Sequence, residues 1–367
     1  MRVGILGAGQ LGRMLALAGY PLGARFRFFD AKPATAGHVA ELVVGDYGDE
    51  GALDRFVDGL DVVTYEFENV PVEAARRLAE RVPVRPPPRA LEVAQDRWVE
   101  KQFFRGLGID TAPFEPVDTR EELDRAVEAI GLPAVLKTRR FGYDGKGQVV
   151  LGGEEDVARA WDALGGRPLI LEGFVPFERE VSMIGVRGVE GDTAFYPVVE
   201  NHHDDGILAL SIAPAPDASP ALREMAESCV GRVLDELEYV GVVAVEFFQH
   251  EGALLANELA PRVHNSGHWS IEGAEISQFE NHMRAVLGLP LGSTAAVGHS
   301  VMRNVIGSAP PRETVLGVEH AHLHLYDKAP RPGRKLGHVT VRAEDRATVE
   351  ASVQELRARI GDDTELA

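Results

Sequence analysis

The first 85 residues alternate short apolar runs with amphipathic stretches, and this alternation constrains the possible fold more than any other feature of the chain. Apolar runs cover residues 3–6, 26–29, 42–44 and 61–65, and helical patterns cover residues 10–19 and 72–81. Strands that alternate with helices are typical of a parallel sheet with helices on its faces. The sequence therefore predicts an N-terminal α/β unit.

The character of the chain changes twice after this unit. Residues 82–90, VPVRPPPRA, form a rigid proline-rich connection. A helical segment and a compact strand, helix and strand series follow. Beyond about residue 170, long alternating runs such as EREVSMIGVRG and VGVVAVEFFQH indicate antiparallel strands. We expect a mixed α/β and α+β protein with three domains, at residues 1–90, 91–170 and 171–367.

A glycine-rich loop follows the first predicted strand. Gly7, Gly9 and Gly12 spell G-x-G-x-x-G, and Asp30 ends the next predicted strand, where an acid that binds a ribose would lie. One interpretation is a dinucleotide site, because glycines allow a ligand to approach closely and the following helix offers unpaired N–H groups. The other is a tight strand-to-helix turn without a cofactor. The local pattern leaves both open.

The composition excludes several classes of protein. The formal net charge of -19 opposes nucleic acid over most of the surface, so an anionic ligand needs a local cluster of Lys and Arg. Cys229 is the single cysteine, so it forms no internal disulfide. No stretch approaches the roughly 20 apolar residues of a membrane helix, and the chain opens as a strand rather than a secretion leader. We therefore expect a cytoplasmic protein without a nucleic-acid or membrane partner.

A second glycine-rich stretch, AVLKTRRFGYDGKGQVVL, covers residues 134–151. One predicted strand carries Lys137, the loop carries Gly142, Gly145, Lys146 and Gly147, and a second strand follows. This order differs from the strand, loop and helix of a Walker loop. A flexible backbone with lysines suits a lid that closes over a triphosphate and excludes water. An exposed glycine hairpin with solvated lysines is the alternative.

A pair of glutamates flanks a predicted hairpin turn. If the turn centres near Gly252, Glu246 and Glu258 lie six residues away on either side and face each other. Opposed carboxylates repel, and Mg²⁺ held by one or two carboxylates plus substrate phosphates would relieve the repulsion. Asn257 and Asn265 could add oxygen ligands or hydrogen bonds. Two solvated glutamates are the alternative, which the surrounding apolar residues disfavour.

Two polar segments complete the candidate site. In residues 261–269, PRVHNSGHW, Arg262 could bind a carboxylate or phosphate, and His264 could transfer a proton near neutral pH. The segment YDKAPRPGRKLGH gathers two lysines and two arginines, which suits a phosphomonoester but also a solvated basic turn. His202 and His203 are adjacent on a predicted strand, so at most one of them faces the site.

Together, GAGQLGRM, GYDGKGQ, NELAPRVHNSGHW and YDKAPRPGRKLGH resemble the ATP-grasp superfamily, and within it the N5-carboxyaminoimidazole ribonucleotide synthase family, over residues 1 to about 340. The resemblance implies a parallel α/β domain, a small lid domain and a C-terminal, mainly antiparallel sheet domain with the ATP site. It also implies a homodimeric ligase of purine biosynthesis that carboxylates 5-aminoimidazole ribonucleotide through carboxyphosphate. The reaction would use ATP, bicarbonate and Mg²⁺, with Mn²⁺ as a substitute.

The same resemblance assigns individual roles. Glu246 and Glu258 would hold the metal, and Arg262, His264 and Lys137 would be catalytic. The implied ATP contacts are Arg97, Lys137, Gly142, Tyr143, Asp144, Gly145, Lys146, Gly147, Gln148, Glu172, Gly173, Phe174, Val175, Glu180, His203, Asn257 and Glu258. The implied nucleotide-substrate contacts are Gly9, Gln10, Glu66, Tyr143, Asp144, Asn265, Lys328, Arg334 and Lys335. The first glycine loop would then need no dinucleotide. The family often has glycine where this chain has Phe141.

Other functions remain open at this point. A formate-dependent glycinamide ribonucleotide transformylase, or another ATP-grasp ligase, would share the three modules, although the transformylase loop after the metal glutamate differs from PRVHNSGHW. Biotin carboxylase is longer and lacks this histidine-rich run. A nicotinamide-dependent oxidoreductase would explain the first glycine loop and Asp30, but it would leave Glu246, Glu258 and the second glycine loop without a purpose. A non-catalytic nucleotide-binding scaffold would need a damaged site, and none is visible.

Overall fold

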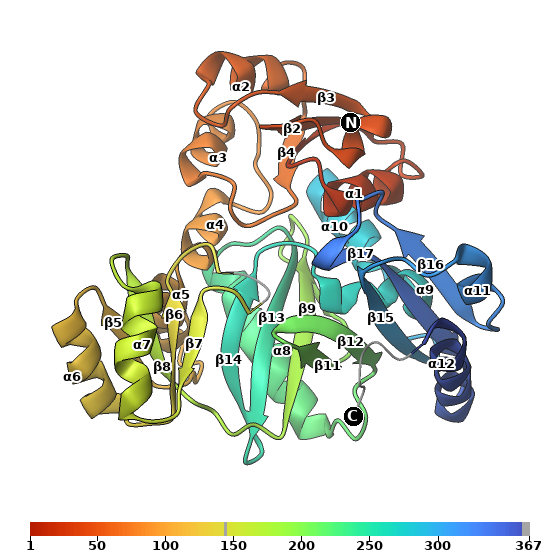
Figure 1. Ribbon diagram of the computed structural model, residues 1–367. Helices are drawn as coiled ribbons and strands as arrows, with labels where there is room; N and C mark the ends of the chain where they lie inside the picture. The colour runs from red at the N-terminus through yellow and green to blue at the C-terminus, as the bar shows by residue number, and fades with distance from the viewer. Residues whose placement is uncertain (143–144, 362–367) are drawn as a thin grey trace.

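The computed structural model describes residues 1–142 and 145–361, which form three β-sheets surrounded by helices. Figure 1 places the N-terminal sheet at the top, a small second sheet at the left and the largest sheet across the centre and right. The sheets follow one another along the chain in the predicted order, parallel first and antiparallel after. The predicted mixed fold class is confirmed.

The N-terminal unit is a parallel sheet with helices around it. Its strands are paired in the order β3-β2-β1-β4, and the carboxyl ends of these strands meet at one edge, which places the loops after β1 and β4 together. The elements are β1 (Arg2–Leu6), α1 (Gln10–Gly19), β2 (Arg25–Asp30), the 3₁₀ turn η1 (Thr35–His38), β3 (Glu41–Val44), α2 (Glu50–Val57), β4 (Val62–Tyr65) and α3 (Val72–Ala79).

The proline-rich stretch does more than connect two domains. Val84 is buried and pairs with Val63 in a parallel bridge, which extends the first sheet. Helix α4 (Pro88–Ala94) begins within the stretch, because proline suits the first position of a helix, where its missing N–H would have no partner. The expected domain limit at residue 90 falls inside this helix.

The second unit is a small antiparallel sheet in the strand order β5-β8-β6-β7. β6 and β7 form the predicted glycine-loop hairpin, in which Lys137 pairs with Gln148. The expected domain limit at residue 170 falls inside β8. The elements are α5 (Arg97–Gly106), β5 (Phe114–Val117), α6 (Arg120–Ile130), β6 (Ala134–Thr138), β7 (Gln148–Leu151), α7 (Glu154–Leu164) and β8 (Leu169–Gly173).

The third unit contains the largest sheet, paired in the order β14-β13-β9-β11-β12-β15-β17-β16, with β10 against β9. Its pairs are antiparallel throughout, as the alternating sequence predicts. The elements are β9 (Arg179–Arg187), β10 (Thr193–Phe195), β11 (Val199–Asp204), β12 (Ile207–Ala213), α8 (Pro220–Glu236), β13 (Gly241–His250), β14 (Ala253–Ala260), η2 (Asn265–Gly267), α9 (Ser270–Gly273), α10 (Gln278–Leu287), β15 (His299–Gly307), α11 (Arg312–Leu316), β16 (Ala321–Leu325), β17 (Arg331–Ala343) and α12 (Arg346–Ile360).

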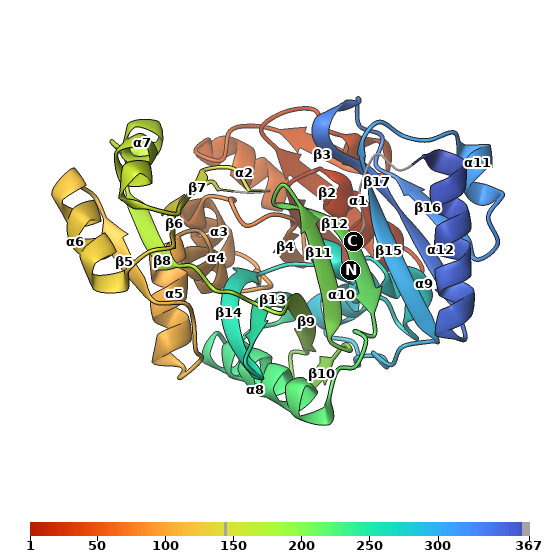
Figure 2. The ribbon, with the colours of Figure 1, turned by 60° about the horizontal axis from the view of Figure 1, so that its bottom comes forward.

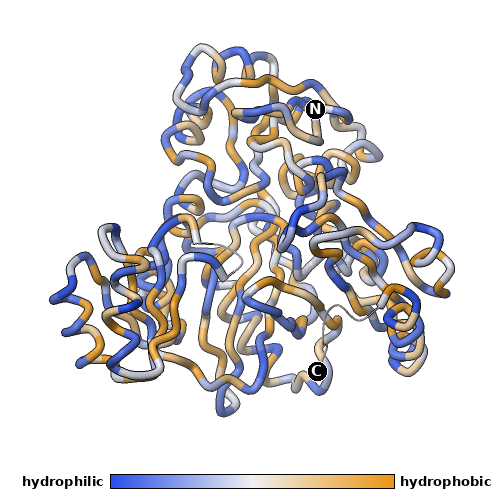
Figure 3. Tube along the Cα trace, viewed as in Figure 1, coloured by the Kyte–Doolittle hydropathy of each residue, from blue (hydrophilic) through white to orange (hydrophobic). Residues whose placement is uncertain are grey.

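Strand alternation divides β13 between two cores. Val243, Val245 and Phe247 belong to the core under α8, whereas Val242 and Ala244 belong to a core shared with α10 and the N-terminal unit. Figure 2 shows α8 on one side of β9, β13 and β14 and the N-terminal unit on the other. Figure 3 shows that hydrophobic residues follow the central strands and that the outer turns are hydrophilic. Because side chains alternate along a strand, Glu246 lies on the same face of β13 as Val242 and Ala244.

Two observations bear on the composition. Cys229 is buried on α8, where it occupies the place of a small apolar residue. Across residues 1–142 and 145–361, each helix is too short or too polar to cross a membrane.

The second unit should depend on its own small core. Leu136 on β6 is fully buried, and we expect Leu136→Ala to lower the free energy of unfolding by about 2–5 kcal/mol, because the neighbours cannot fill the cavity. Val150→Ala on β7 is the matched control, since Val150 is 51% exposed and its truncation should cost less than about 1 kcal/mol. Urea denaturation measures both; equal losses would contradict this account.

Candidate active site

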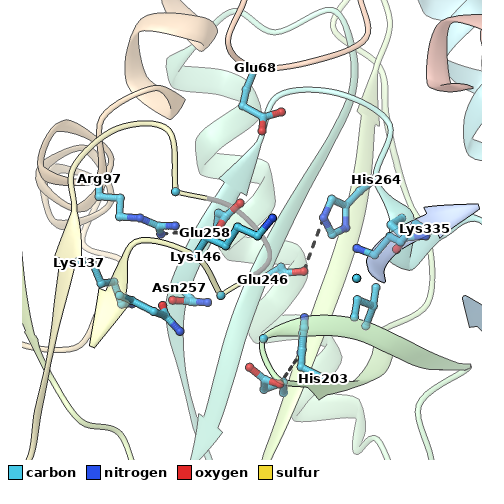
Figure 4. Close-up of a pocket in the computed structure, with 18 of the residues that line it drawn as sticks. Glu68, Arg97, Lys137, Lys146, His203, Glu246, Asn257, Glu258, His264 and Lys335 are labelled. Carbon is cyan, nitrogen blue, oxygen red and sulfur yellow. Dashed lines mark hydrogen bonds and ion pairs between the residues drawn. The ribbon is translucent and has the colours of Figure 1, made fainter. Parts of the chain in front are cut away.

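One cavity of about 700 Å³ lies where the three units meet. Its walls come from the loop after β4, from the second sheet with its glycine loop, and from the large sheet. Figure 4 shows side chains from these elements directed into the same space. The predicted residues that line it are Gln10, Glu66, Arg97, Lys137, Gly142, Gly145, Lys146, Gln148, Glu172, Gly173, Phe174, Val175, Glu180, His203, Glu246, Asn257, Glu258, Arg262, His264, Asn265, Lys328, Arg334 and Lys335.

Four predicted site residues stand apart from this set. Gly9 and Gly147 are not among the residues lining the cavity, although each lies in a loop that borders it. Gly147 has a φ of 75°, and a Cβ there would lie 2.6 Å from Oγ1 of Thr138, so this glycine shapes the turn of the loop. Tyr143 and Asp144 lie outside the described residues.

The hairpin of β13 and β14 places the two glutamates opposite each other, as predicted, but the pairing depends on a register shift as well as on the turn. Its turn consists of Glu251 and Gly252, whose φ angles are 49° and 78°, and two positive values are typical of a two-residue hairpin turn. This turn alone would pair Glu246 with residue 257. The register shifts by one residue next to Glu246, however, so that Glu246 pairs with Glu258.

The shift is a β-bulge that turns Glu258 toward the cavity. Before the bulge, Leu254 and Ala256 belong to the core under α8, and after it Leu259 belongs to that core. Without the extra residue, Glu258 would share the face of Leu254 and Ala256, because a slip of one residue moves a side chain to the other face of a sheet. Asn257 is the inserted residue.

Helix α5 satisfies backbone groups around the bulge. The Nζ of Lys101 donates to the carbonyl oxygens of Ala256 and Asn257, at 3.2 and 2.8 Å. Oε1 of Glu100 accepts from the N–H of Leu259 at 2.6 Å. Left buried and unpaired, such groups would each cost about 1–3 kcal/mol. Buried side chains of α5 thus hold the geometry that opposes the two glutamates.

Oxygen acceptors gather at this hairpin, and the cations nearby offset only part of their charge. Burial raises the pKa of Glu246 to about 7, and the nearby Glu258 and Glu180 add to this effect. Oδ1 of Asn257 is buried, and no described residue donates to it. Nη1 of Arg97 lies 3.6 Å from Oε2 of Glu258 and offsets part of the charge. This oxygen-rich set fits Mg²⁺, whose ligands are carboxylate, amide and phosphate oxygens.

Lys137 is held by a buried ion pair beside the hairpin. Its Nζ lies 2.9 Å from Oε2 of Glu172, and Nζ of Lys101 lies 3.5 Å from the same oxygen. Burial alone would raise the pKa of Glu172, but Lys101, Lys137 and Arg97 together lower it to about 2. Glu172 is therefore ionised, and it fixes the position of the Lys137 ammonium group.

The first glycine loop is filled from within the protein. Glu66 accepts hydrogen bonds from the N–H groups of Gly9 and Gly12, the latter at 2.6 Å. Asp30 accepts from the N–H of Ala8 at 2.9 Å. These N–H groups at the start of α1 are the ones that would hold a dinucleotide phosphate. Because the Glu66 carboxylate takes that place, the geometry disfavours the dinucleotide interpretation.

Arg262 is fixed by an ion pair between the N-terminal unit and the large sheet. Its Nε donates to Oε2 of Glu68, in the loop after β4, and its Nη1 donates to the carbonyl oxygen of Val263 at 3.2 Å. Burial would raise the pKa of Glu68, but Arg262 lowers it, so both groups are charged. Among the described residues none accepts from Nη2, which leaves this edge of the guanidinium available to a ligand.

His264 is an uncharged donor in this site. The N–H of Ser266 donates to its Nδ1 at 3.3 Å, which leaves the ring proton on Nε2, 3.6 Å from Oε1 of Glu246. Burial lowers the pKa of His264 well below its usual range, and Arg262 and Lys335 lower it further. The expected titration near neutral pH does not fit this environment; a neutral Nε2–H does.

Of the two adjacent histidines, His203 lines the cavity and His202 does not. Nδ1 of His203 lies 2.6 Å from Oε2 of Glu180. His202 instead bonds Glu200 at 2.9 Å. The expectation that at most one of them faces the site is confirmed.

The last basic segment borders the cavity on the side of the large sheet. Arg13 on α1 ties this region to the N-terminal unit, because its Nη1 donates to the carbonyl oxygen of Leu325, at the end of β16, at 3.1 Å. Clustered cations along a cavity favour the binding of an anion over a solvated basic turn. The cations of this segment that line the cavity are Lys328, Arg331, Arg334 and Lys335.

Several lining residues were not predicted. Glu68 follows Glu66 by two residues at the edge where parallel strands end, and that position was a usable signal. Phe248 lies on the strand face of Glu246, by the period of two, and stacks on Phe177 with ring centroids 4.8 Å apart. His268 lies in the predicted polar segment 261–269, and Tyr326 and Arg331 lie in the predicted basic segment 326–338, but no individual role was assigned to them. No local pattern distinguished Asn69 and Phe177. The lining residues that were not predicted as site residues include Glu68, Asn69, Phe177, Phe248, His268, Tyr326 and Arg331.

Comparison with protein families matches three consecutive parts of the chain. The ribonucleotide synthetase preATP-grasp domain matches residues 1–95, and the ATP-grasp domain matches residues 102–279. The phosphoribosylaminoimidazole carboxylase C-terminal domain matches residues 300–352.

Whole-length relatives agree with these matches. The N5-carboxyaminoimidazole ribonucleotide synthase of Pseudomonas aeruginosa is 56% identical over 361 residues, which cover 98% of this chain and 99% of the relative. The synthetase structure from Thermus thermophilus is 61% identical, with a TM-score of 0.95 over 99% of this chain and 100% of that one. A synthase from Aspergillus clavatus, solved with ADP and 5-aminoimidazole ribonucleotide, is 33% identical, with a TM-score of 0.91 over 98% of each chain.

The fold and the site define an ATP-grasp ligase, in which the glycine-loop hairpin of β6 and β7 faces a sheet that carries paired carboxylates. The chain belongs to the N5-carboxyaminoimidazole ribonucleotide synthase family.

The Glu172 ion pair predicts a pH dependence of stability. The folded pKa of about 2 lies below the ordinary value of 4.5, so the stabilisation is present above about pH 4.5 and is lost as the pH falls toward 2. We expect Glu172→Gln to be less stable at neutral pH, because Lys101 and Lys137 lose their counter-charge, and to lose less stability on acidification. Urea denaturation of both proteins at neutral and acidic pH tests this; parallel pH dependences would contradict it.

Proposed function

We propose that this protein converts 5-aminoimidazole ribonucleotide, ATP and bicarbonate into N5-carboxyaminoimidazole ribonucleotide, ADP and phosphate. The observation that carries the proposal is the opposed, half-buried pair Glu246 and Glu258, with the unpartnered Oδ1 of Asn257 beside it, in a cavity bounded by the glycine loop and the basic segment. The Aspergillus clavatus relative, solved with ADP and 5-aminoimidazole ribonucleotide, supports the proposal. Cytoplasmic location and a homodimeric assembly are expected with this function.

ATP binds, in this proposal, between the second sheet and the β13–β14 hairpin. Lys137 and Arg97 bring positive charge to its phosphates, and Glu172 keeps the Lys137 ammonium group in place. The partly exposed Phe174 and Val150 offer apolar surface to the base. The glycine loop at 142–148 closes over the phosphates and excludes water.

Mg²⁺ would be held by Glu246 and Glu258, with Oδ1 of Asn257 as a further oxygen. Among the described residues no group of three or more acidic, His or Cys side chains could hold an ion alone, so substrate phosphates would complete the coordination. When bound, the ion neutralises charge on the phosphates during phosphoryl transfer. Mn²⁺ has similar ligand preferences and would serve as a substitute.

The chemistry divides into two steps. A bicarbonate oxygen attacks the γ-phosphorus and the bond to ADP breaks, which gives carboxyphosphate. Its C–O bond then breaks to give carbon dioxide and phosphate; the exocyclic amine forms the new N–C bond, and its proton passes to the phosphate. The free edge of Arg262 and the Nε2–H of His264 suit the oxygens of bicarbonate and of the intermediate.

The nucleotide substrate lies, in this proposal, between the N-terminal unit and the basic segment. Cations at the rim hold its phosphate, and the first glycine loop borders its base and ribose. The residues proposed to bind it are Gly9, Gln10, Glu66, Tyr143, Asp144, Asn265, Lys328, Arg334 and Lys335.

Release of ADP by the purified protein tests the function directly. With MgATP present, we expect release to require both bicarbonate and 5-aminoimidazole ribonucleotide, and label from bicarbonate to appear in an acid-labile product. Formate with glycinamide ribonucleotide is the rival substrate pair. Release only with the rival pair, or with neither, would reject the proposed reaction and leave the ATP-grasp class in place.

Loss of one proposed metal-binding carboxylate should slow turnover strongly without unfolding the protein. We expect Glu258→Gln to lower kcat about 100-fold or more, because an electrostatic contact to developing charge is typically worth that much. Glu251→Gln is the matched control, since Glu251 is exposed in the turn of the same hairpin. ADP release and thermal unfolding are measured for both; a near-normal rate in Glu258→Gln would refute the metal assignment.

A further inference from the structure

Gln278, the first residue of α10, contacts two histidines of the loop after β14. Its Oε1 accepts from the N–H of His264 at 2.9 Å, and its Nε2 donates to the carbonyl oxygen of the same residue at 2.6 Å. Because backbone groups have fixed donor and acceptor roles, the amide has one possible orientation. The second hydrogen on Nε2 is therefore directed to Nδ1 of His268, 3.1 Å away.

This contact fixes the tautomer of His268. Nδ1 accepts the hydrogen bond from Gln278, so the ring proton resides on Nε2. The ring lines the cavity and packs against Phe279 and His338, with centroids 5.3 and 5.0 Å away. Among the described residues none bonds Nε2 of His268. Burial lowers the pKa of this ring well below its usual range, and nearby imidazoles and cations add to the effect.

A chain of buried donors fixes His264 in the same tautomer. The side-chain amide of Asn201 donates to Oγ of Ser182, which donates to Oγ of Ser266. The N–H of Ser266 in turn donates to Nδ1 of His264, and its Oγ lies 2.9 Å from the same atom. Both histidines thus carry an uncharged Nε2–H, and Gln278 contacts both residues.

We propose that His268 is a further catalytic residue, whose uncharged Nε2–H acts beside that of His264 as a donor to the carboxyl oxygens derived from bicarbonate, and that Gln278 is the positioning residue that maintains this state. The identity of the ligand rests on the proposed function. The tautomer rests on the hydrogen bonds of Gln278 alone.

Neutral donors suit this chemistry better than charged ones. An imidazolium would protonate the attacking amine, which must keep its lone pair, or the N-carboxylate product, which loses carbon dioxide when its nitrogen is protonated. A neutral imidazole N–H donates a hydrogen bond to developing negative charge but does not release its proton near neutral pH. The buried, Gln278-bonded ring of His268 meets this requirement.

Nitrogen NMR of protein labelled with [¹⁵N]histidine tests the tautomer without any assay of activity. The His268 signals are identified by their loss in His268→Asn. We expect proton attachment at Nε2 in the ligand-free wild-type protein. Attachment at Nδ1, or at both nitrogens near neutral pH, would overturn the proposal. A wild-type protein that does not carboxylate would reject the proposed function, and the spectra would still decide the tautomer.

Two substitutions then separate the effect of the Nε2–H donor of His268 from the effect of its Nδ1 contact with Gln278. Asn at 268 retains an oxygen that can accept from Gln278 but has no donor at the position of Nε2, whereas Gln places an amide N–H near that position. We expect His268→Asn to lower kcat about 100-fold with the KM for ATP within about twofold, and His268→Gln to be at least tenfold faster than His268→Asn. His322→Asn, an exposed histidine on β16, is the control and should keep the wild-type rate. Equal losses in both His268 variants, or a near-normal rate in His268→Asn, would overturn the catalytic role.

Discussion

One extra residue in a strand sets the geometry on which the site depends. Asn257 interrupts the regular pairing of β13 and β14, and the bulge moves Glu258 from the core under α8 to the face where Glu246 already points. Two buried side chains of α5, Lys101 and Glu100, satisfy backbone groups around the bulge. Opposed carboxylates repel each other, and the proposed Mg²⁺ between them would relieve that repulsion. In the proposed reaction, the metal, the ATP phosphates and the glycine loop would all be placed relative to this pair.

Contacts between the units keep the cavity in shape around the hairpin. A shared hydrophobic core docks the N-terminal sheet against α10. Polar contacts then cross the gap nearer the site: Arg262 pairs with Glu68 of the N-terminal unit, and Arg97 on α5 approaches Glu258. Glu66 accepts from the N–H groups of the N-terminal glycine loop, which disfavours dinucleotide binding there. A loop that resembles a cofactor site thus serves as a rigid wall of the cavity.

The sequence predicted elements whose signals are local, and it missed those that depend on long-range contacts. Apolar alternation was enough for the parallel and antiparallel sheets and for the glycine-loop hairpin. The Glu246–Glu258 pairing was predicted from a turn centred on Gly252. The turn is in fact centred between Glu251 and Gly252, and it is the bulge that pairs Glu246 with Glu258. The local sequence contained no signal for this bulge, because the groups that stabilise it, Lys101 and Glu100, lie on α5. Glu68 was missed because its partner Arg262 lies 194 residues away, and His268 was predicted only as part of the polar segment 261–269, because its bond to Gln278 joins separate elements.

The transfer of oxygen from bicarbonate to phosphate tests most directly whether the reaction passes through carboxyphosphate. The enzyme would be supplied with MgATP, 5-aminoimidazole ribonucleotide and ¹⁸O-labelled bicarbonate, and the released phosphate would be examined by mass spectrometry. The account predicts one labelled oxygen in each phosphate, because the bond between that oxygen and the γ-phosphorus survives when carboxyphosphate breaks at its C–O bond. Unlabelled phosphate from an enzyme that carboxylates its substrate would contradict the carboxyphosphate route, and with it the roles proposed for Arg262 and His264.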